Sequence, residues 1–253
     1  MIKAILCGAA GRMGREIINA IEGASDIKII AGVEEKSNPF VNRFISSVKI
    51  VDDIQKVITE ADCVIDFTNP GATMENLRNS ARFKKPYCIG TTGFTPEQIA
   101  EIKKFSQEFP IFFSPNMSMG INVLYNLVEK VTQDLSEYDI EIIETHHRGK
   151  KDAPSGTAQA IGERIKKVKP DAKLIYGRQG MTGEREKKEI CISAIRGGDV
   201  VGEHRILFLG QGEFIELRHF ATSRRCFAEG TLKAIRFIVK KKKGFYTMSD
   251  LLG

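Results

Sequence analysis

Over roughly the first 115 residues, short apolar segments alternate with amphipathic ones, and this alternation constrains the fold more than any other feature of the sequence. Five apolar segments are expected to be strands, at residues 2–7, 27–33, 63–67, 86–89 and 111–113. They are apolar at successive positions, as strands are when helices cover both faces of a sheet. Strands connected by helices run parallel, so the sequence predicts an α/β fold with a doubly wound parallel sheet.

The segments between these strands carry helix signals. In residues 12–21, Ile17, Ile18 and Ile21 form one apolar face at helical spacing. Residues 95–109 begin with Thr95 and Pro96, and Gln98 follows three residues after the threonine. This is the pattern of a capping box with proline at the first helical position, so it predicts a helix start.

The pattern changes after residue 117. We expect a helix at 118–135, a strand at 139–145 and a helix at 156–167, followed by three strands at 189–195, 204–209 and 214–220. Strands that follow one another without helices favour antiparallel or mixed pairing, which predicts a second domain of α+β type with a mixed sheet. The last amphipathic helix, at 227–241, is expected to return to the first domain. The predicted domains are therefore 1–117 with 226–253, and 118–225.

A glycine-rich turn follows the first predicted strand and opens the first helix. Its residues are Gly8, Ala9, Ala10, Gly11, Arg12 and Met13, with Gly14 next. Glycine lets the backbone approach a pyrophosphate, and the N–H groups of a helix N-terminus favour its negative charge. The spacing is GxxGxxG rather than the commoner GxGxxG, and a plain tight turn is the alternative. We interpret the segment as the dinucleotide-binding turn of a Rossmann-type domain.

Glu34 supports this interpretation. It follows the second strand, about 20 residues after the glycine turn, where a carboxylate can accept hydrogen bonds from the adenosine ribose. The next residue is Glu35 rather than the arginine that usually meets the 2′-phosphate of NADP, and Lys36 offsets the two carboxylates only in part. We therefore expect NADH to be used at least as well as NADPH.

Two further loops follow strands at the edge where a doubly wound sheet binds its ligands. Their small and hydroxyl-bearing residues suit a nicotinamide amide and ribose, and an ordinary turn is the alternative for each. The residues are Gly90, Thr91 and Thr92 in one loop and Ser114, Pro115, Asn116 and Met117 in the other.

The densest group of ionisable side chains lies at residues 146–151, where two histidines, one arginine and two lysines occur together. Histidine titrates near neutral pH and lysine offers a compact charge and a proton, so we interpret the group as an anion site joined to proton transfer. Ser155 is placed to cap the next helix, whose first N–H groups, at Gly156 and Thr157, suit a carboxylate. A basic loop or a metal site are the alternatives; since no third ligand has a zinc spacing, no metal is expected.

Residues 141–158 resemble the signature of the 4-hydroxy-tetrahydrodipicolinate reductase family, also called dihydrodipicolinate reductases. The family pattern E-[IV]-x-E-x-H-x-x-x-K-x-D-x-P-S-G-T-A is met from Glu141 to Ala158 without a mismatch. The glycine turn, the loop at 90–93 and the segment at 114–122 are similar to family elements in the same order. The resemblance therefore covers essentially the whole chain.

The resemblance implies NADH- or NADPH-dependent reduction of a small dicarboxylate, 4-hydroxy-tetrahydrodipicolinate, in the diaminopimelate route of lysine biosynthesis. It implies that His146 donates or accepts a proton and that Lys150 is a second donor near the substrate nitrogen. The first domain would bind the dinucleotide, and the second would bind the substrate and form a homotetramer. The implied substrate-binding residues are His147, Ser155, Gly156, Thr157 and Arg224, with Arg225 as an alternative to Arg224. The implied cofactor contacts are the glycine turn, Glu34 and the two loops, with Met117 where relatives often have Phe and Glu35 where some have Arg.

Charge and composition indicate which other classes of protein the sequence disfavours. The net charge of +6 suits either nucleic acid or anionic small molecules. The only dense basic run, residues 240–243, ends a predicted helix, so no nucleic-acid partner is expected. No apolar run approaches the roughly 20 residues of a membrane span. The five cysteines include no CxxC pair and are expected to be reduced thiols of a cytoplasmic protein. Another two-domain Rossmann dehydrogenase, acting on an amino acid or a semialdehyde, and a non-catalytic dinucleotide sensor remain as alternatives.

Overall fold

The computed structural model describes residues 1–253, and the chain divides into two compact units. The first unit comprises Met1–Met119 and Arg224–Gly253, and the second comprises Gly120–Ser223. None of the helices combines the length and the apolar composition that crossing a membrane requires.

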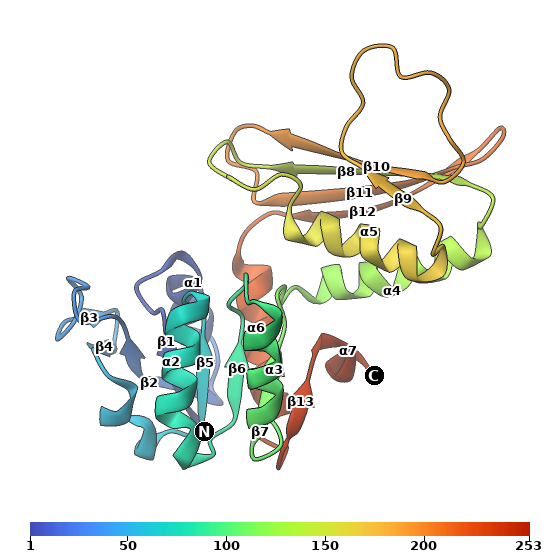
Figure 1. Ribbon diagram of the computed structural model, residues 1–253. Helices are drawn as coiled ribbons and strands as arrows, with labels where there is room; N and C mark the ends of the chain where they lie inside the picture. The colour runs from blue at the N-terminus through green and yellow to red at the C-terminus, as the bar shows by residue number, and fades with distance from the viewer. The chain divides into compact units, whose positions relative to one another are not determined.

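The first unit is built on an eight-stranded sheet with the order β13-β7-β6-β5-β1-β2-β4-β3 (Figure 1). All of its pairings are parallel except that of β3 with β4. The chain passes from β1 to β2 on one side and reaches β5 on the other, which creates a switch point at the carboxyl end of β1. The strands are β1 (Ile2–Cys7), β2 (Ile27–Val33), β3 (Phe44–Ile45), β4 (Val48–Val51), β5 (Cys63–Asp66), β6 (Tyr87–Ile89), β7 (Pro110–Phe113) and β13 (Gly244–Tyr246).

Helices cover both faces of this sheet, which confirms the predicted doubly wound arrangement. On one face, α1 (Arg12–Glu22) and α6 (Arg225–Ile238) pack against Ala4 and Leu6 of β1. On the other face, α2 (Pro70–Ser80) and α3 (Pro96–Phe105) pack against Ile5 and Cys7. Successive residues from Ala4 to Cys7 are thus buried in opposite layers, which is why this part of β1 is apolar at every position. The short helix α7 (Met248–Leu252) follows β13.

Several elements of the first unit were not predicted. Helix α2 begins with the ordinary signals, because Asn69 accepts a hydrogen bond from the Ala72 N–H and Pro70 is its first residue. Its buried face is short and partly polar, so the helical pattern is weak in the sequence. Strands β3, β4 and β13 have two to four residues, too few for a periodic pattern. The helix predicted at 95–109 ends at Phe105, although its capping box is present.

The second unit contains a five-stranded mixed sheet with the order β12-β11-β8-β10-β9, as predicted for this part (Figure 1). The central strand β8 runs parallel to β10 and antiparallel to β11, so the consecutive strands β10 and β11 are not neighbours. Helices α4 (Met119–Asp134) and α5 (Gly156–Val168) cover one face of the sheet. The strands are β8 (Asp139–His146), β9 (Lys173–Ile175), β10 (Glu189–Arg196), β11 (Gly202–Leu209) and β12 (Phe214–Ala221).

Candidate functional site

The turn between β1 and α1 brings the backbone close to its neighbours. Gly8 has a φ of +82°, and a Cβ there would lie 2.5 Å from the Phe67 carbonyl oxygen. A Cβ at Gly14 would lie 2.2 Å from the Gly8 carbonyl oxygen, so the helix can begin this close to the strand only with glycine. The N-cap residue of α1 is Gly11, which has no side chain to accept a hydrogen bond from the first turn. The N–H groups of that turn are therefore available to solvent or to an anionic ligand.

Glu34 lies directly after β2 and contacts this turn. Its Oε1 accepts a hydrogen bond from the Ala10 N–H at 2.5 Å, and its Oε2 accepts one from Asn38 Nδ2 at 3.0 Å. Burial raises the pKa of Glu34, although both hydrogen bonds act in the opposite direction. The structure therefore brings together the two elements of the predicted dinucleotide site, the glycine turn and the acid.

A pocket of about 530 Å³ opens beside these elements, within the usual size range of ligand sites. Besides Gly8, Gly11 and Glu34, its walls include residues that the sequence analysis did not single out: Asp52, Thr68, Asn69, Glu75 and Asn76. Thr68 and Asn69 follow β5. The rule that ligands bind at the carboxyl ends of neighbouring parallel strands could have found them.

The predicted loop at Gly90, Thr91 and Thr92 is tied to this region by a buried carboxylate. Asp66, the last residue of β5, is fully buried. Its Oδ1 accepts hydrogen bonds from the hydroxyls of Thr68 at 2.6 Å, Thr73 at 2.9 Å and Thr91 at 3.3 Å. Its Oδ2 accepts one from the Tyr87 hydroxyl at 2.8 Å and one from Asn76 Nδ2 at 3.2 Å. Asp66 thus connects the loops that follow β5 and β6.

The loop from Ser114 to Met117 follows β7. The Ser114 hydroxyl donates to the Asn116 carbonyl at 2.7 Å, and Asn116 Oδ1 accepts from the Ser118 N–H at 2.9 Å, so the loop is held by its own polar groups. The Met117 side chain is buried in a core with Phe112, Ala234 and Ile238. Its predicted contact with the nicotinamide stays a prediction.

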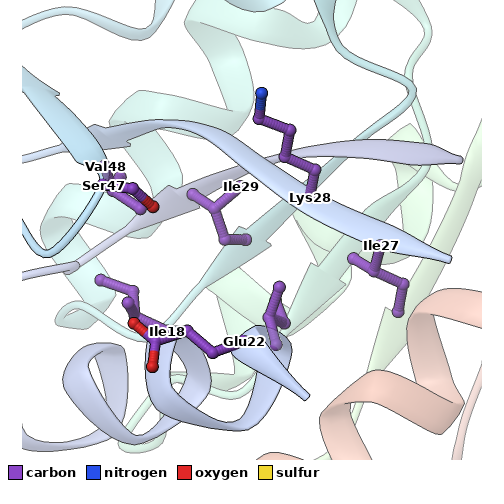
Figure 2. Close-up of a pocket in the computed structure, with 8 residues that line it drawn as sticks. Ile18, Glu22, Ile27, Lys28, Ile29, Ser47 and Val48 are labelled. Atoms are coloured by element: carbon purple, nitrogen blue, oxygen red, sulfur yellow. The ribbon is translucent and has the colours of Figure 1, made fainter. Parts of the chain in front are cut away.

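A second hollow in this unit, of about 170 Å³, lies between α1, β2 and the start of β4. Figure 2 shows Ile18 and Ile29 pointing toward each other across it, whereas Lys28 extends in the opposite direction. Its lining is mainly aliphatic and includes none of the predicted site residues. It therefore has no part in the candidate site.

The predicted catalytic histidine lies in the second unit, at the end of β8. His146 is largely buried, and its Nδ1 lies 2.5 Å from Oε2 of the fully buried Glu144. Arg196, at the end of β10, donates to both oxygens of Glu144, at 2.7 and 2.8 Å. Burial alone would raise the pKa of Glu144, but hydrogen bonds from His146, Arg196 and the Ser155 N–H outweigh it and lower the pKa to about 2.

Ser155 caps α5 as predicted, and it is also hydrogen-bonded on its other side. Its hydroxyl accepts a hydrogen bond from the Ala158 N–H at 3.2 Å and lies 3.2 Å from Nε2 of His204. His204 is buried, and its Nδ1 has no hydrogen-bond partner in the protein. Burial, reinforced by His146, lowers the pKa of His204 to about 3, so the ring is neutral at physiological pH.

The predicted proton donor Lys150 and the predicted substrate-binding residues His147 and Gly156 differ in their surroundings. The Lys150 ammonium lies 2.8 Å from both oxygens of Asp152, and the His147 N–H donates to the Val200 carbonyl at 2.8 Å. A Cβ at Gly156 would meet nothing within 4 Å, so the start of α5 is open at this position. These residues, with His146 and Ser155, all belong to the second unit.

Arg224 and Arg225 belong to the first unit instead, at the start of α6. Arg225 Nε pairs with Glu229 at 3.1 Å. The role of Arg224 in substrate binding, with Arg225 as the alternative, stays a prediction.

Two further features concern metal binding and disulfide formation. No group of three or more His, Cys, Asp or Glu side chains is arranged to hold a metal ion. None of the five cysteines forms a disulfide bond, and four of them are buried.

Comparison with known proteins gives full-length matches. Residues 2–117 match the family described as dihydrodipicolinate reductase, N-terminus, and residues 120–252 match its C-terminus. A 4-hydroxy-tetrahydrodipicolinate reductase of Methanocaldococcus jannaschii is 45% identical over 268 residues, covering 100% of this chain and 98% of that protein. Its counterpart from Geotalea daltonii is 41% identical over 265 residues, covering 100% and 99%.

Solved structures agree with the sequence matches. The dipicolinate-bound dihydrodipicolinate reductase from Paenisporosarcina sp. TG-14 is similar with a TM-score of 0.79 at 25% identity, covering 98% of this chain and 97% of that chain. An amine dehydrogenase from Mycobacterium smegmatis has a TM-score of 0.65 at 10% identity over 99% and 95% of the two chains, which shows a shared fold alone. The matches do not favour the alternatives of another Rossmann dehydrogenase or a dinucleotide sensor.

Proposed function

The chain belongs to the dihydrodipicolinate reductase family, and from this premise we propose that it reduces 4-hydroxy-tetrahydrodipicolinate to tetrahydrodipicolinate in the diaminopimelate route of lysine biosynthesis. It is an oxidoreductase that uses a nicotinamide cofactor. One observation carries the proposal. The matched signature at 141–158 folds into a single site, in which His146 and the capped start of α5 are held by the same carboxylate, Glu144.

The residues of the first unit fit a dinucleotide. The positive φ of Gly8, the uncapped start of α1 and the adjacent Glu34 match what a pyrophosphate and an adenosine ribose require. The glycine turn, Glu34 and the loops at 90–92 and 114–117 would hold the cofactor. When bound, the nicotinamide supplies a hydride to carbon 4 of the substrate ring.

The residues of the second unit would bind the dicarboxylate and move protons. His147 and the N–H groups of Gly156 and Thr157 would hold one carboxylate at the start of α5, with Arg224 as a further contact. Water leaves the 4-hydroxy form, and the reduced ring takes up a proton that His146 or Lys150 delivers. A solved relative that is described as dipicolinate-bound supports a small dicarboxylate as ligand.

The central test is His146→Gln, with His147→Gln as the matched variant. His146→Gln should lower kcat about a hundredfold or more because the proton donor is lost, and it should leave the Kd for NADH nearly unchanged. His147→Gln should mainly raise KM for the dicarboxylate. NADH absorbance loss with enzymatically generated substrate measures both, and an unchanged kcat in His146→Gln would remove this residue from the mechanism.

We also propose that NADH is used at least as well as NADPH. The pocket beside Glu34 is also lined by the carboxylates of Glu35, Asp52 and Glu75, and Lys36 is the one cation in its lining. Lys56, which is not part of the lining, pairs with Asp52. This balance disfavours a 2′-phosphate. A kcat/KM that favours NADPH by more than about tenfold, or about 1.4 kcal/mol, contradicts the proposal. Glu35→Arg should shift the ratio toward NADPH.

Assembly and location complete the proposal. We propose a homotetramer formed through the face of the second unit's sheet that α4 and α5 leave open, because Phe214 and Phe220 of β12 are exposed there. Light scattering at several protein concentrations gives the stoichiometry. We propose a cytoplasmic location, which five cysteines that form no disulfide bond support.

A further inference from the structure

Both carboxylate oxygens of Glu144 are fully hydrogen-bonded. It is fully buried in β8, and each oxygen accepts two hydrogen bonds. Oε2 faces His146 Nδ1 at 2.5 Å and Arg196 Nη1 at 2.8 Å. Oε1 faces Arg196 Nη2 at 2.7 Å and the Ser155 N–H at 2.9 Å. These donors come from three parts of the fold: the end of β8, the end of β10 and the start of α5.

The chemistry of this arrangement determines the state of the histidine ring. A carboxylate that is ionised has no proton to donate, so it is only an acceptor. The ring nitrogen that faces it must therefore carry the hydrogen, and in the neutral ring this leaves Nε2 as the unprotonated atom. Arg196 supplies the opposite charge that an otherwise isolated buried carboxylate would lack.

The space beside Nε2 of His146, on the opposite side of the ring from Glu144, depends on a glycine. A Cβ at Gly202, on β11, would lie 3.0 Å from Nε2 of His146 and would crowd this atom. Glycine at this position leaves room beside the nitrogen that must exchange its proton. The nearby ionisable groups are His204 on the same side of the sheet, and Lys150 with Asp152 in the loop after β8.

We propose that Glu144, held by Arg196, is the positioning residue for proton transfer: it fixes the tautomer and direction of the His146 ring and, through the Ser155 N–H, the distance from that ring to the start of α5. The inference rests on the proposed function, in which α5 receives a substrate carboxylate. Because one carboxylate holds both groups, the proton donor and the carboxylate subsite keep a constant separation, and such fixed geometry is a large source of rate enhancement. The arrangement parallels the way an aspartate orients the histidine of a serine protease triad.

The test is Glu144→Gln, which keeps the shape and removes the charge. A glutamine offers one oxygen and one NH₂ group, so it cannot accept from His146, Arg196 and Ser155 together. We expect kcat to fall about a hundredfold or more, with the Kd for NADH, measured by fluorescence, within about twofold of wild type. Nitrogen NMR of protein labelled in histidine should show one tautomer of His146 in wild type and a mixture in the variant.

Two further variants keep the result interpretable. Glu203→Gln, on the neighbouring strand β11, removes a carboxylate that pairs with Arg218 and should leave kcat and the His146 tautomer unchanged. Glu144→Asp retains the charge but draws it back by one methylene, so it should keep the tautomer and lower kcat by about tenfold. It replaces Glu144→Gln if that variant does not fold.

The outcomes separate the two proposals. A Glu144→Gln enzyme with kcat within about threefold of wild type, or with the same single tautomer, overturns the role of Glu144. An inactive wild-type protein would instead refute the proposed function, while the NMR comparison would still decide whether Glu144 sets the tautomer.

Discussion

Replacing His204 should make the protein less sensitive to mild acid. His204 is 4% exposed, and its Nδ1 lacks a partner in the protein. Burial lowers its pKa from 6.5 to about 3, with a further contribution from His146. The unfolded chain therefore binds a proton at this residue as pH falls through 6.5, and the folded chain does not bind it until pH approaches 3. The contribution of neutral His204 to the free energy of unfolding is therefore fully present above pH 6.5 and decreases as pH falls from 6.5 toward 3.

The size of the effect follows from these two values. One pKa unit corresponds to about 1.4 kcal/mol, so between pH 7 and pH 5 the protonation of the unfolded chain at this residue lowers the free energy of unfolding by about 2 kcal/mol. The full difference of about 3.5 units would amount to roughly 5 kcal/mol in stronger acid. His204→Gln keeps a neutral polar side chain beside Ser155 and removes the titration.

Urea unfolding at pH 7, 6 and 5 measures the difference. The free energy of unfolding of His204→Gln should fall by about 2 kcal/mol less than that of wild type over this range, whatever its value at pH 7. His219, which pairs with His204 across β12 and β11, is half-buried, and burial lowers its pKa as well. His219→Gln should show a smaller change of the same sign. Equal pH dependence in wild type and His204→Gln would refute the assignment of His204 as a neutral buried ring.

Two further substitutions test the first unit. Gly8→Ala should destabilise the protein by about 1–3 kcal/mol and weaken NADH binding, because it strains a positive φ and places a Cβ 2.5 Å from the Phe67 carbonyl oxygen. Thermal unfolding measures the first effect and fluorescence titration with NADH the second. Gly23→Ala is the control, because the nearest atom to its added Cβ would be 3.8 Å away. Asp66→Asn should cost about 1–3 kcal/mol, since the amide cannot accept from all the hydroxyls around it; a melting temperature within 1 °C of wild type would contradict this.

The parts of the fold that the sequence predicted are those whose signal is local and repeated. Strand β1 and helix α1 were predicted because Ala4 to Cys7 alternate between the two helix layers and Ile17, Ile18 and Ile21 share one face. The caps at Thr95 and Ser155 were visible because the capping side chain and its partner are three residues apart. The neighbour order of β10, β8 and β11 was not visible, because it depends on contacts between distant segments.

The same distinction explains the site. His146, Lys150 and Ser155 could be predicted because they lie within one short segment that matches a family signature. Arg196 and His204 were missed, although they contact Glu144 and Ser155, because they come from β10 and β11 and stand alone in the sequence. Asp66 was missed for a related reason. An acid at the end of an apolar strand has no signal of its own until the threonines around it are brought together.

Residues 146–151 are strongly basic in sequence, but in the folded chain two of them lie beside carboxylates. This affects how the region would bind an anion. His146 faces Glu144, and the Lys150 ammonium lies 2.8 Å from both oxygens of Asp152, so both side chains already have acidic partners. The two pairs differ in burial, because Glu144 is fully buried whereas the Asp152 side chain is 59% exposed. An exposed pair contributes only about 0–1 kcal/mol, so a substrate carboxylate could replace Asp152 at Lys150 at little cost. Displacing Glu144 from His146 would instead remove a hydrogen bond from a fully buried carboxylate, which costs more. Lys150 is thus the group suited to exchange partners, and His146 the group suited to stay fixed while it transfers a proton.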